Sequence, residues 1–191
     1  WKEVGLGTLA MGITYTLFYV LGTWSLSYGV KGLGFQQSEY LLLQMVSVVF
    51  FAIFIVVSCI YADKVGRKKV LFITTAATLV FSFFTPFLLV PSASHILVFL
   101  CVGFVLMGGL FGPCGAYLPE LFPVNVRYSG AGLSYNLAAI FGGAFAPTIA
   151  QALVNSKFGV AGVGWYMAVM AAVALLALFL IKESKDKDYT L

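Results

Sequence analysis

Charged side chains able to form ion pairs are concentrated in two short segments of an otherwise apolar sequence. The first, residues 63–69, reads Asp-Lys-Val-Gly-Arg-Lys-Lys. Gly66 can adopt the backbone angles of a tight reversal, and Asp63 can favour the positive end of a neighbouring helix. Arg67 and Lys68 can pair with carboxylates or lipid phosphates. The segment is either a basic loop with a glycine turn or a latch, by which we mean a charge network that breaks and re-forms as two helix bundles rock.

The second charged segment, residues 117–132, combines charge with residues that end or begin helices. Pro119 and Pro123 are expected to end one helix, and Ser129 can cap the next. Glu120 and Arg127 flank the turn and are candidates for an ion pair across it. The segment is either a helical corner with routine capping or part of a moving gate.

Metal and nucleophilic chemistry have little support in the sequence. Cys59, Cys101 and Cys114 are far apart and lie within apolar runs, which is typical of packing residues. His95 is the single histidine, so no metal site and no cofactor are expected. An intramembrane protease using Ser134 and His95 stays as an alternative, but His95 lies at the end of an apolar run rather than inside it.

The elements that must position these residues are membrane-spanning helices. Of the 191 residues, 61% are hydrophobic and only 9% are charged, and the mean hydropathy is +1.01. This composition excludes a water-soluble domain. Six apolar runs without Asp, Glu, Lys or Arg are each long enough to cross a bilayer core of about 30 Å: residues 4–30, 40–62, 70–90, 96–118, 128–154 and 160–181. The sequence predicts an all-α membrane protein of six transmembrane helices, with residues 182–191 as a cytoplasmic tail.

The distribution of basic residues predicts the orientation of these helices. The side that holds both chain ends carries nine: Lys2, Lys64, Arg67, Lys68, Lys69, Arg127, Lys182, Lys185 and Lys187. The other side carries two, Lys31 and Lys157. Because cytoplasmic loops are enriched in Lys and Arg, both termini are expected in the cytoplasm. The net charge of +4 then reflects topology and contact with membrane lipids, and no nucleic-acid partner is expected.

The two charged segments resemble motifs of the major facilitator superfamily. Asp-x-x-Gly-Arg-Lys between two spans is similar to a loop signature of that superfamily. The run from Pro119 to Gly132, followed by Tyr135, Gly142-Gly143 and Ala146-Pro147, resembles the second half of its metabolite:proton symporter family. In family terms, Asp63, Gly66, Arg67 and Lys68 form the latch of this half, and Glu120 and Arg127 form the adjoining charge pair.

This resemblance implies spans seven to twelve of a twelve-span transporter in the cell inner membrane. The partner would be an N-terminal half of six spans, and the cargo a small molecule such as citrate, 2-oxoglutarate, shikimate, proline or betaine, carried with protons. Residues 1–94 and 95–191 each hold three spans, as in the 3+3 inverted repeat of such halves. The first residue, Trp1, also favours a fragment of a longer chain.

Small and polar residues recur on one face of several spans, as expected along a substrate path. The candidates for hydrogen bonding to a substrate are Tyr15, Tyr19, Gln44, Tyr135 and Asn136. Amides and phenols are costly in hydrocarbon unless they are paired or wetted, so they should face protein or water. They form either the wall of a cavity or interhelical contacts worth about 0.6 kcal/mol each.

The fourth span is the candidate for a bend. Gly112-Pro113 weakens the helix locally, and the Gly108-x-x-x-Gly112 spacing lets helices approach closely. A bending helix beside a cavity fits alternating access, whereas close packing alone is the simpler interpretation.

No span contains an acidic residue, although a proton-coupled carrier usually needs an intramembrane carboxylate. That carboxylate is therefore expected in the other half. The resulting hypothesis is a secondary active transporter rather than an enzyme, which moves a small organic acid or zwitterion with protons. The alternatives are a self-contained six-span channel or carrier, an intramembrane enzyme, and a structural membrane module.

Overall fold

The computed structural model describes residues 1–181, and every regular element in that part of the chain is a helix. Six helical segments are long and apolar enough to cross a membrane, which confirms the predicted all-α fold with six transmembrane helices. The predicted tail, residues 182–191, lies outside the described residues.

Two of the six spans are interrupted by π-turns. The first span consists of α1 (Lys2–Tyr19), the π-turn η1 (Val20–Trp24) and α2 (Ser25–Lys31). The fifth consists of the short 3₁₀ turn η2 (Val124–Val126), α6 (Arg127–Ala138), the π-turn η3 (Ala139–Ala144) and α7 (Ala146–Val154). The remaining spans are α3 (Gln37–Val65), α4 (Arg67–Leu88), α5 (Ala93–Glu120) and α8 (Gly159–Leu180).

The helices extend beyond the apolar runs into the charged segments. α3 continues to Val65 and α4 begins at Arg67, so Gly66 alone connects them, with a φ of +113° that favours glycine. The charged segment 63–69 is therefore mostly helical rather than a loop. Similarly, α6 begins at Arg127, which places Ser129 inside its first turn rather than at the cap. Charged residues outside the hydrocarbon region are compatible with helix, so hydropathy does not mark these ends.

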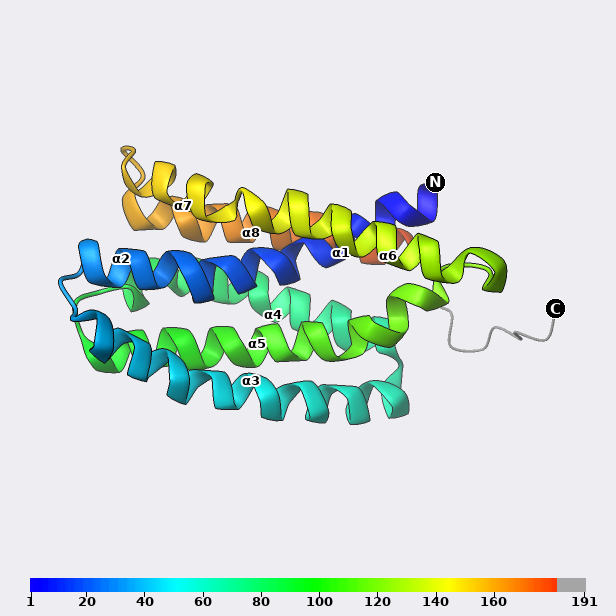
Figure 1. Ribbon diagram of the computed structural model, residues 1–191, viewed down its shortest axis with the longest axis horizontal. Coiled ribbons are helices and arrows are strands. Elements are labelled where there is room, and N and C mark those ends of the chain that lie inside the picture. The colour runs from blue at the N-terminus through cyan, green and yellow to red at the C-terminus, as the bar shows by residue number, and fades with distance from the viewer. Residues whose placement is uncertain (182–191) are drawn as a thin grey trace.

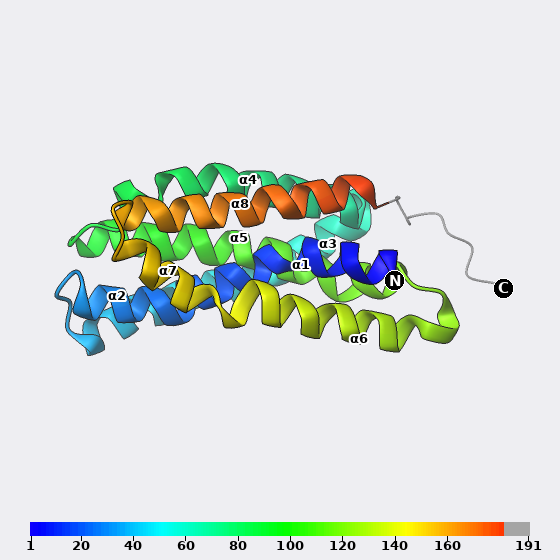
Figure 2. The same cartoon turned by 90° about the horizontal axis from the view of Figure 1, so that it is seen from above.

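The six spans lie side by side as one bundle with the first and fourth at its centre (Figures 1 and 2). α5 contacts α3 and α4, and α1 contacts α8 and α6. In Figure 1 α4 and α8 lie behind the other spans; in Figure 2 they form the upper edge of the bundle and α6 lies along its lower edge. The apolar windows of the first and fourth spans are each 56% buried, against 17% for α3. The candidate residues on α1 and α5 therefore lie on the two most deeply buried spans.

α3 and α5 approach closely because α5 presents glycines to α3. A Cβ added at Gly112 would lie 2.3 Å from Ser58 Oγ and 2.7 Å from the Ile55 carbonyl oxygen. Ser58 also donates to the carbonyl of Gly108 at 3.1 Å. Without a hydrophobic driving force between helices in lipid, such small-residue packing and interhelical hydrogen bonds hold helices together.

α5 runs as one helix from Ala93 to Glu120, with Pro113 and Pro119 inside it. Gly112 packs closely against α3, as expected if the glycines of this span serve close packing. Pro119 lies one residue before the helix end instead of terminating the helix itself.

Candidate functional site: a charge network at helix ends and a tyrosine cluster between spans

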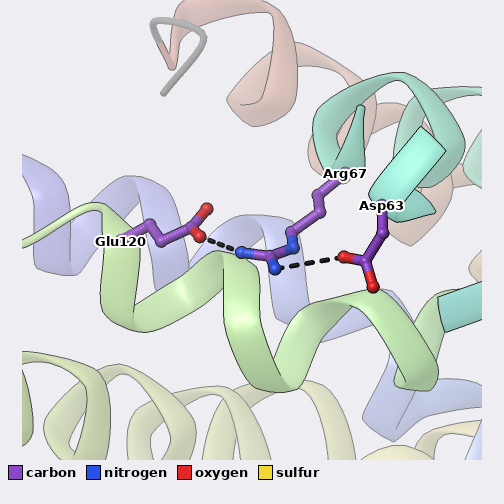
Figure 3. Close-up of polar contacts among 3 residues, drawn as sticks. All are labelled: Asp63, Arg67 and Glu120. Atoms are coloured by element: carbon purple, nitrogen blue, oxygen red, sulfur yellow. Dashed lines mark hydrogen bonds and ion pairs between the residues drawn. The ribbon is translucent and has the colours of Figure 1, made fainter. Parts of the chain in front are cut away.

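Arg67 forms ion pairs with two carboxylates that come from two other helices (Figure 3). Arg67 is the first residue of α4, Asp63 lies in the last turn of α3, and Glu120 is the last residue of α5. The Nη2 atom of Arg67 lies 3.1 Å from Asp63 Oδ1, and its Nη1 atom donates to Glu120 Oε1. One guanidinium thus links the ends of three helices.

The position of Arg67 explains why it needs these carboxylates. Arg67, Lys68 and Lys69 occupy the first turn of α4, where the helix dipole is positive and cations are unfavourable. Asp63 and Glu120 offset this charge. The side chains of Arg67 and Glu120 remain 30% and 23% exposed, and that of Asp63 65% exposed. Partly exposed pairs of this kind contribute only about 0–1 kcal/mol, so they can break and re-form at small cost.

Lys68 joins α4 to the sixth span. Its Nζ atom donates to the backbone carbonyl of Ile181, directly after α8. The carboxyl end of a helix carries negative partial charge, so a cation is favourable there. Arg67 and Lys68 therefore connect α4 in two directions, toward α5 and toward α8.

Arg127 begins α6 and donates from Nε to the carbonyl of Phe122 at 3.5 Å. The structure brings Glu120 to Arg67, a partner 53 residues away that local spacing did not reveal. The ion pair between Glu120 and Arg127 stays a prediction.

The candidate substrate residues divide into two groups. Tyr15 and Tyr19 on α1 and Tyr135 on α6 are half-buried, and Tyr15 and Tyr135 lie within electrostatic range of each other and of Cys114 on α5. These tyrosines form a cluster between α1, α5 and α6, which we call the tyrosine cluster. Its phenols come from the first and the fifth span, and their contact with a substrate stays a prediction.

Gln44 and Asn136 have other partners. The amide nitrogen of Gln44 on α3 donates to the carbonyls of Leu21 and Gly22 at 2.8 and 3.0 Å, which ties α3 to η1. The Asn136 amide donates to Gly132 in its own helix at 2.7 Å and remains exposed. The contacts of Gln44 match the interhelical alternative, and those of Asn136 leave its side chain at the surface of α6.

Sequence reasoning missed Thr16 and the two π-turns. Thr16 on α1 is fully buried and donates to the carbonyl of Gly142 in η3 at 2.6 Å. The Gly142-Gly143 pair was a visible signal for close approach, but no local pattern in the sequence marks a π-turn. Among residues 1–181, no group of three or more His, Cys, Asp or Glu side chains is placed to hold a metal ion.

Comparison with known proteins places these features in a family. The family model described as Major Facilitator Superfamily matches residues 4–190. The chain is 42% identical to the inner membrane metabolite transport protein YhjE of Escherichia coli (strain K12), over 96% of this chain and 43% of that protein. It is 30% identical to a citrate-proton symporter of Klebsiella pneumoniae, over 93% of this chain and 40% of the symporter.

A third relative is a glycine betaine/proline/ectoine/pipecolic acid transporter, OusA, of Dickeya dadantii (strain 3937). It is 28% identical over 98% of this chain and 37% of its own length. The chain thus spans less than half the length of these relatives. No solved structure matches the chain.

Proposed function

Because the chain belongs to the major facilitator superfamily, we propose that it forms the C-terminal half of a secondary active transporter of the inner membrane. It moves a small polar metabolite with protons by alternating access, and its partner is an N-terminal half of six spans. The relatives compared above are named as transport proteins rather than enzymes, which argues against the intramembrane protease.

The observation that carries the proposal is the network of Arg67, Asp63 and Glu120. It joins three helix ends by partly exposed ion pairs, which suits a contact that must open in each transport cycle. Gly66, with its positive φ, fixes the reversal that brings Asp63 beside Arg67. The network acts as the latch of this half, and Lys68 holds α4 against α8 while the latch opens.

The relatives and the tyrosine cluster support the proposed substrate class. One relative is named for citrate and protons, and another for betaine and proline. No Lys or Arg lies within the apolar part of a span, so the charge that binds a carboxylate group comes from the other half, or the substrate is a zwitterion. In both cases Tyr15, Tyr19 and Tyr135 supply hydrogen bonds from this half.

Proton coupling requires a titratable group in the path. In this chain Glu39 and Glu120 lie at opposite ends of the bundle, in the first turn of α3 and at the end of α5. We therefore assign the coupling carboxylate to the N-terminal half. The Glu39→Gln variant of the full-length protein should keep proton-coupled uptake, and loss of coupling with intact substrate binding would contradict this assignment.

The experiment that tests the function is uptake into proteoliposomes that contain the full-length protein. Radiolabelled citrate, 2-oxoglutarate, shikimate, proline and glycine betaine are offered one by one, with and without an inward proton gradient. Accumulation of one of them above its external concentration, abolished by a protonophore, supports proton symport. Gradient-independent equilibration would instead favour a channel, and proteolysis lost on Ser134→Ala would favour an enzyme.

A further inference from the structure

The two π-turns among the described residues interrupt the first and fifth spans, and these spans pack against each other. η1 contacts α7, and η3 contacts α1. A π-turn interrupts the regular ladder of backbone hydrogen bonds and occurs frequently at functional sites. Here each π-turn is followed by a short helix, α2 or α7, that completes the span.

One buried side chain connects the first span to the π-turn of the fifth. Thr16 Oγ1 lies 2.6 Å from the carbonyl oxygen of Gly142 and 3.0 Å from that of Gly12, one turn back in its own helix. A threonine inside a helix commonly bonds only within that helix. The second acceptor, 126 residues away, makes this hydroxyl an interhelical contact.

The two backbones also approach each other closely at this level of the bundle. A Cβ at Gly142 would lie 2.3 Å from the Gly12 carbonyl oxygen, and a Cβ at Gly143 would lie 2.7 Å from the ring of Tyr19 and 3.3 Å from Tyr15 Cβ. Tyr15 and Tyr19 therefore pack directly on η3. Any sliding of η3 along α1 would move the two tyrosines.

We propose that Thr16 is a positioning residue: by holding η3 against α1, it fixes Tyr15 and Tyr19 in the orientation with which the tyrosine cluster binds substrate. The part of this inference that concerns substrate rests on the proposed transport function. The part that concerns the fold does not, because the bond also sets how α2 and α7, which follow the two π-turns, lie relative to each other.

The separation of α2 and α7 gives a test that needs no substrate. Ser27 on α2 and Asn155 after α7 line the same cavity of about 450 Å³ between these helices. In the full-length protein with every native cysteine replaced by Ser, Cys59, Cys101 and Cys114 included, spin labels on Ser27→Cys and Asn155→Cys report their distance by pulsed electron paramagnetic resonance. Thr16→Val should broaden or shift this distance distribution, whereas Thr16→Ser, which keeps the hydroxyl, should not.

A matched control is present in the same helix. Thr8 is buried on α1, and its hydroxyl has no hydrogen-bond partner within residues 1–181, so Thr8→Val makes the same chemical change without breaking an interhelical bond. Each variant is first checked for a monodisperse elution profile in detergent. If folded Thr16→Val has the same label-to-label distance distribution as the protein with Thr16, the positioning role is overturned, whatever the protein transports.

The second readout is the affinity for the substrate that the uptake panel identifies. We expect Thr16→Val to raise the KM about three- to tenfold, the effect of one lost hydrogen bond, with kcat changed less than about twofold. Thr16→Ser should restore the parental KM. A shifted distance distribution with an unchanged KM would retain the helix coupling and refute the link to the tyrosine cluster, and failure of all uptake would count against the proposed function instead.

Discussion

At the residue scale, Arg67 matters because it links three helix ends, although each of its ion pairs is weak. It begins a helix whose first turn holds three cations, and two carboxylates from other helices compensate for that charge. Each pair is partly exposed and weak, so the network adds little to stability. In the proposed latch its role is conformational, since Arg67 is the shared partner of both pairs and its release would remove the ionic links of α4 to α3 and to α5 together.

Arg67→Ala should therefore slow transport more than it weakens substrate binding. We expect transport to fall at least about fivefold, corresponding to about 1 kcal/mol, while the Kd for substrate changes less than about twofold. Uptake rates in proteoliposomes and equilibrium binding to the detergent-solubilised full-length protein measure the two effects. Lys69→Ala is the matched control because Lys69 is an exposed cation of the same turn. Equal losses in rate and affinity would show that the network is no latch.

The sequence revealed the members of this network but not all of their partners. Asp63, Gly66 and Arg67 lie close together in the chain, so their spacing indicated a tight charged reversal. The pairing of Arg67 with Glu120 depends on how α4 and α5 pack, and nothing local encodes it. For Gln44 the sequence left open a substrate contact and an interhelical contact, and the structure shows that its amide donates to carbonyls of η1.

At the element scale, the contact between α3 and α5 depends on glycines with no room for a side chain. Gly108 and Gly112 both meet backbone atoms of α3: a Cβ at Gly108 would lie 2.8 Å from the Phe51 carbonyl oxygen, and one at Gly112 would lie 2.7 Å from that of Ile55. Backbone cannot rotate away as a flexible side chain can. A substitution here must move one helix.

Gly112→Ala should destabilise the bundle by about 1–3 kcal/mol, the usual cost of overpacking. Thermal unfolding of the detergent-solubilised full-length protein, followed by loss of the monodisperse elution peak, measures the effect. Gly115→Ala is the matched control, since Gly115 lies in the same helix and an added Cβ there meets nothing within 4 Å. If both variants unfold at the same temperature as the parent, the close approach of α3 and α5 does not contribute to stability.

The six spans were predictable because a chain segment in lipid must make its backbone hydrogen bonds internally, which an apolar run of sufficient length does as a helix. The π-turns were not predictable, because they change the backbone hydrogen-bond pattern without changing the hydropathy of the sequence. η3 coincides with Gly142 and Gly143, and these glycines serve the packing against Gly12 and Tyr19. The sequence led us to expect a bend at Gly112-Pro113, which stays a prediction, and it gave no sign of the two π-turns in the first and fifth spans.

At the scale of the whole molecule, charge and burial are both distributed unevenly. The end of the bundle at which α1, α4 and α6 begin and α3 ends (Figure 1) holds the basic residues at these helix ends, which are Lys2, Lys64, Arg67, Lys68, Lys69 and Arg127. The opposite end, where α2 ends and α7 connects to α8, holds Lys31 and Lys157. Across the bundle, α3 exposes apolar side chains such as Met45 (67% exposed) and Val56 (59%), which suits contact with lipid or with another helical half.

The charge asymmetry makes the orientation testable with single cysteines in the full-length protein, after every native cysteine, Cys59, Cys101 and Cys114 included, is replaced by Ser. Ser38→Cys and Asn155→Cys lie at the end with few basic residues and should react with a membrane-impermeant maleimide added to intact cells. Lys64→Cys and Asn125→Cys lie at the basic end and should react only after permeabilisation.

All four positions are exposed, so the reagent can react with each cysteine that lies on the same side of the membrane as the reagent. The labelling pattern therefore reports the side of the membrane on which each position lies. The physical reason is that Lys and Arg near span ends are retained on the cytoplasmic side during insertion. The reverse pattern would place the network of Arg67, Asp63 and Glu120 outside the cell. The latch would then control opening toward the outside, although the described contacts would be unchanged.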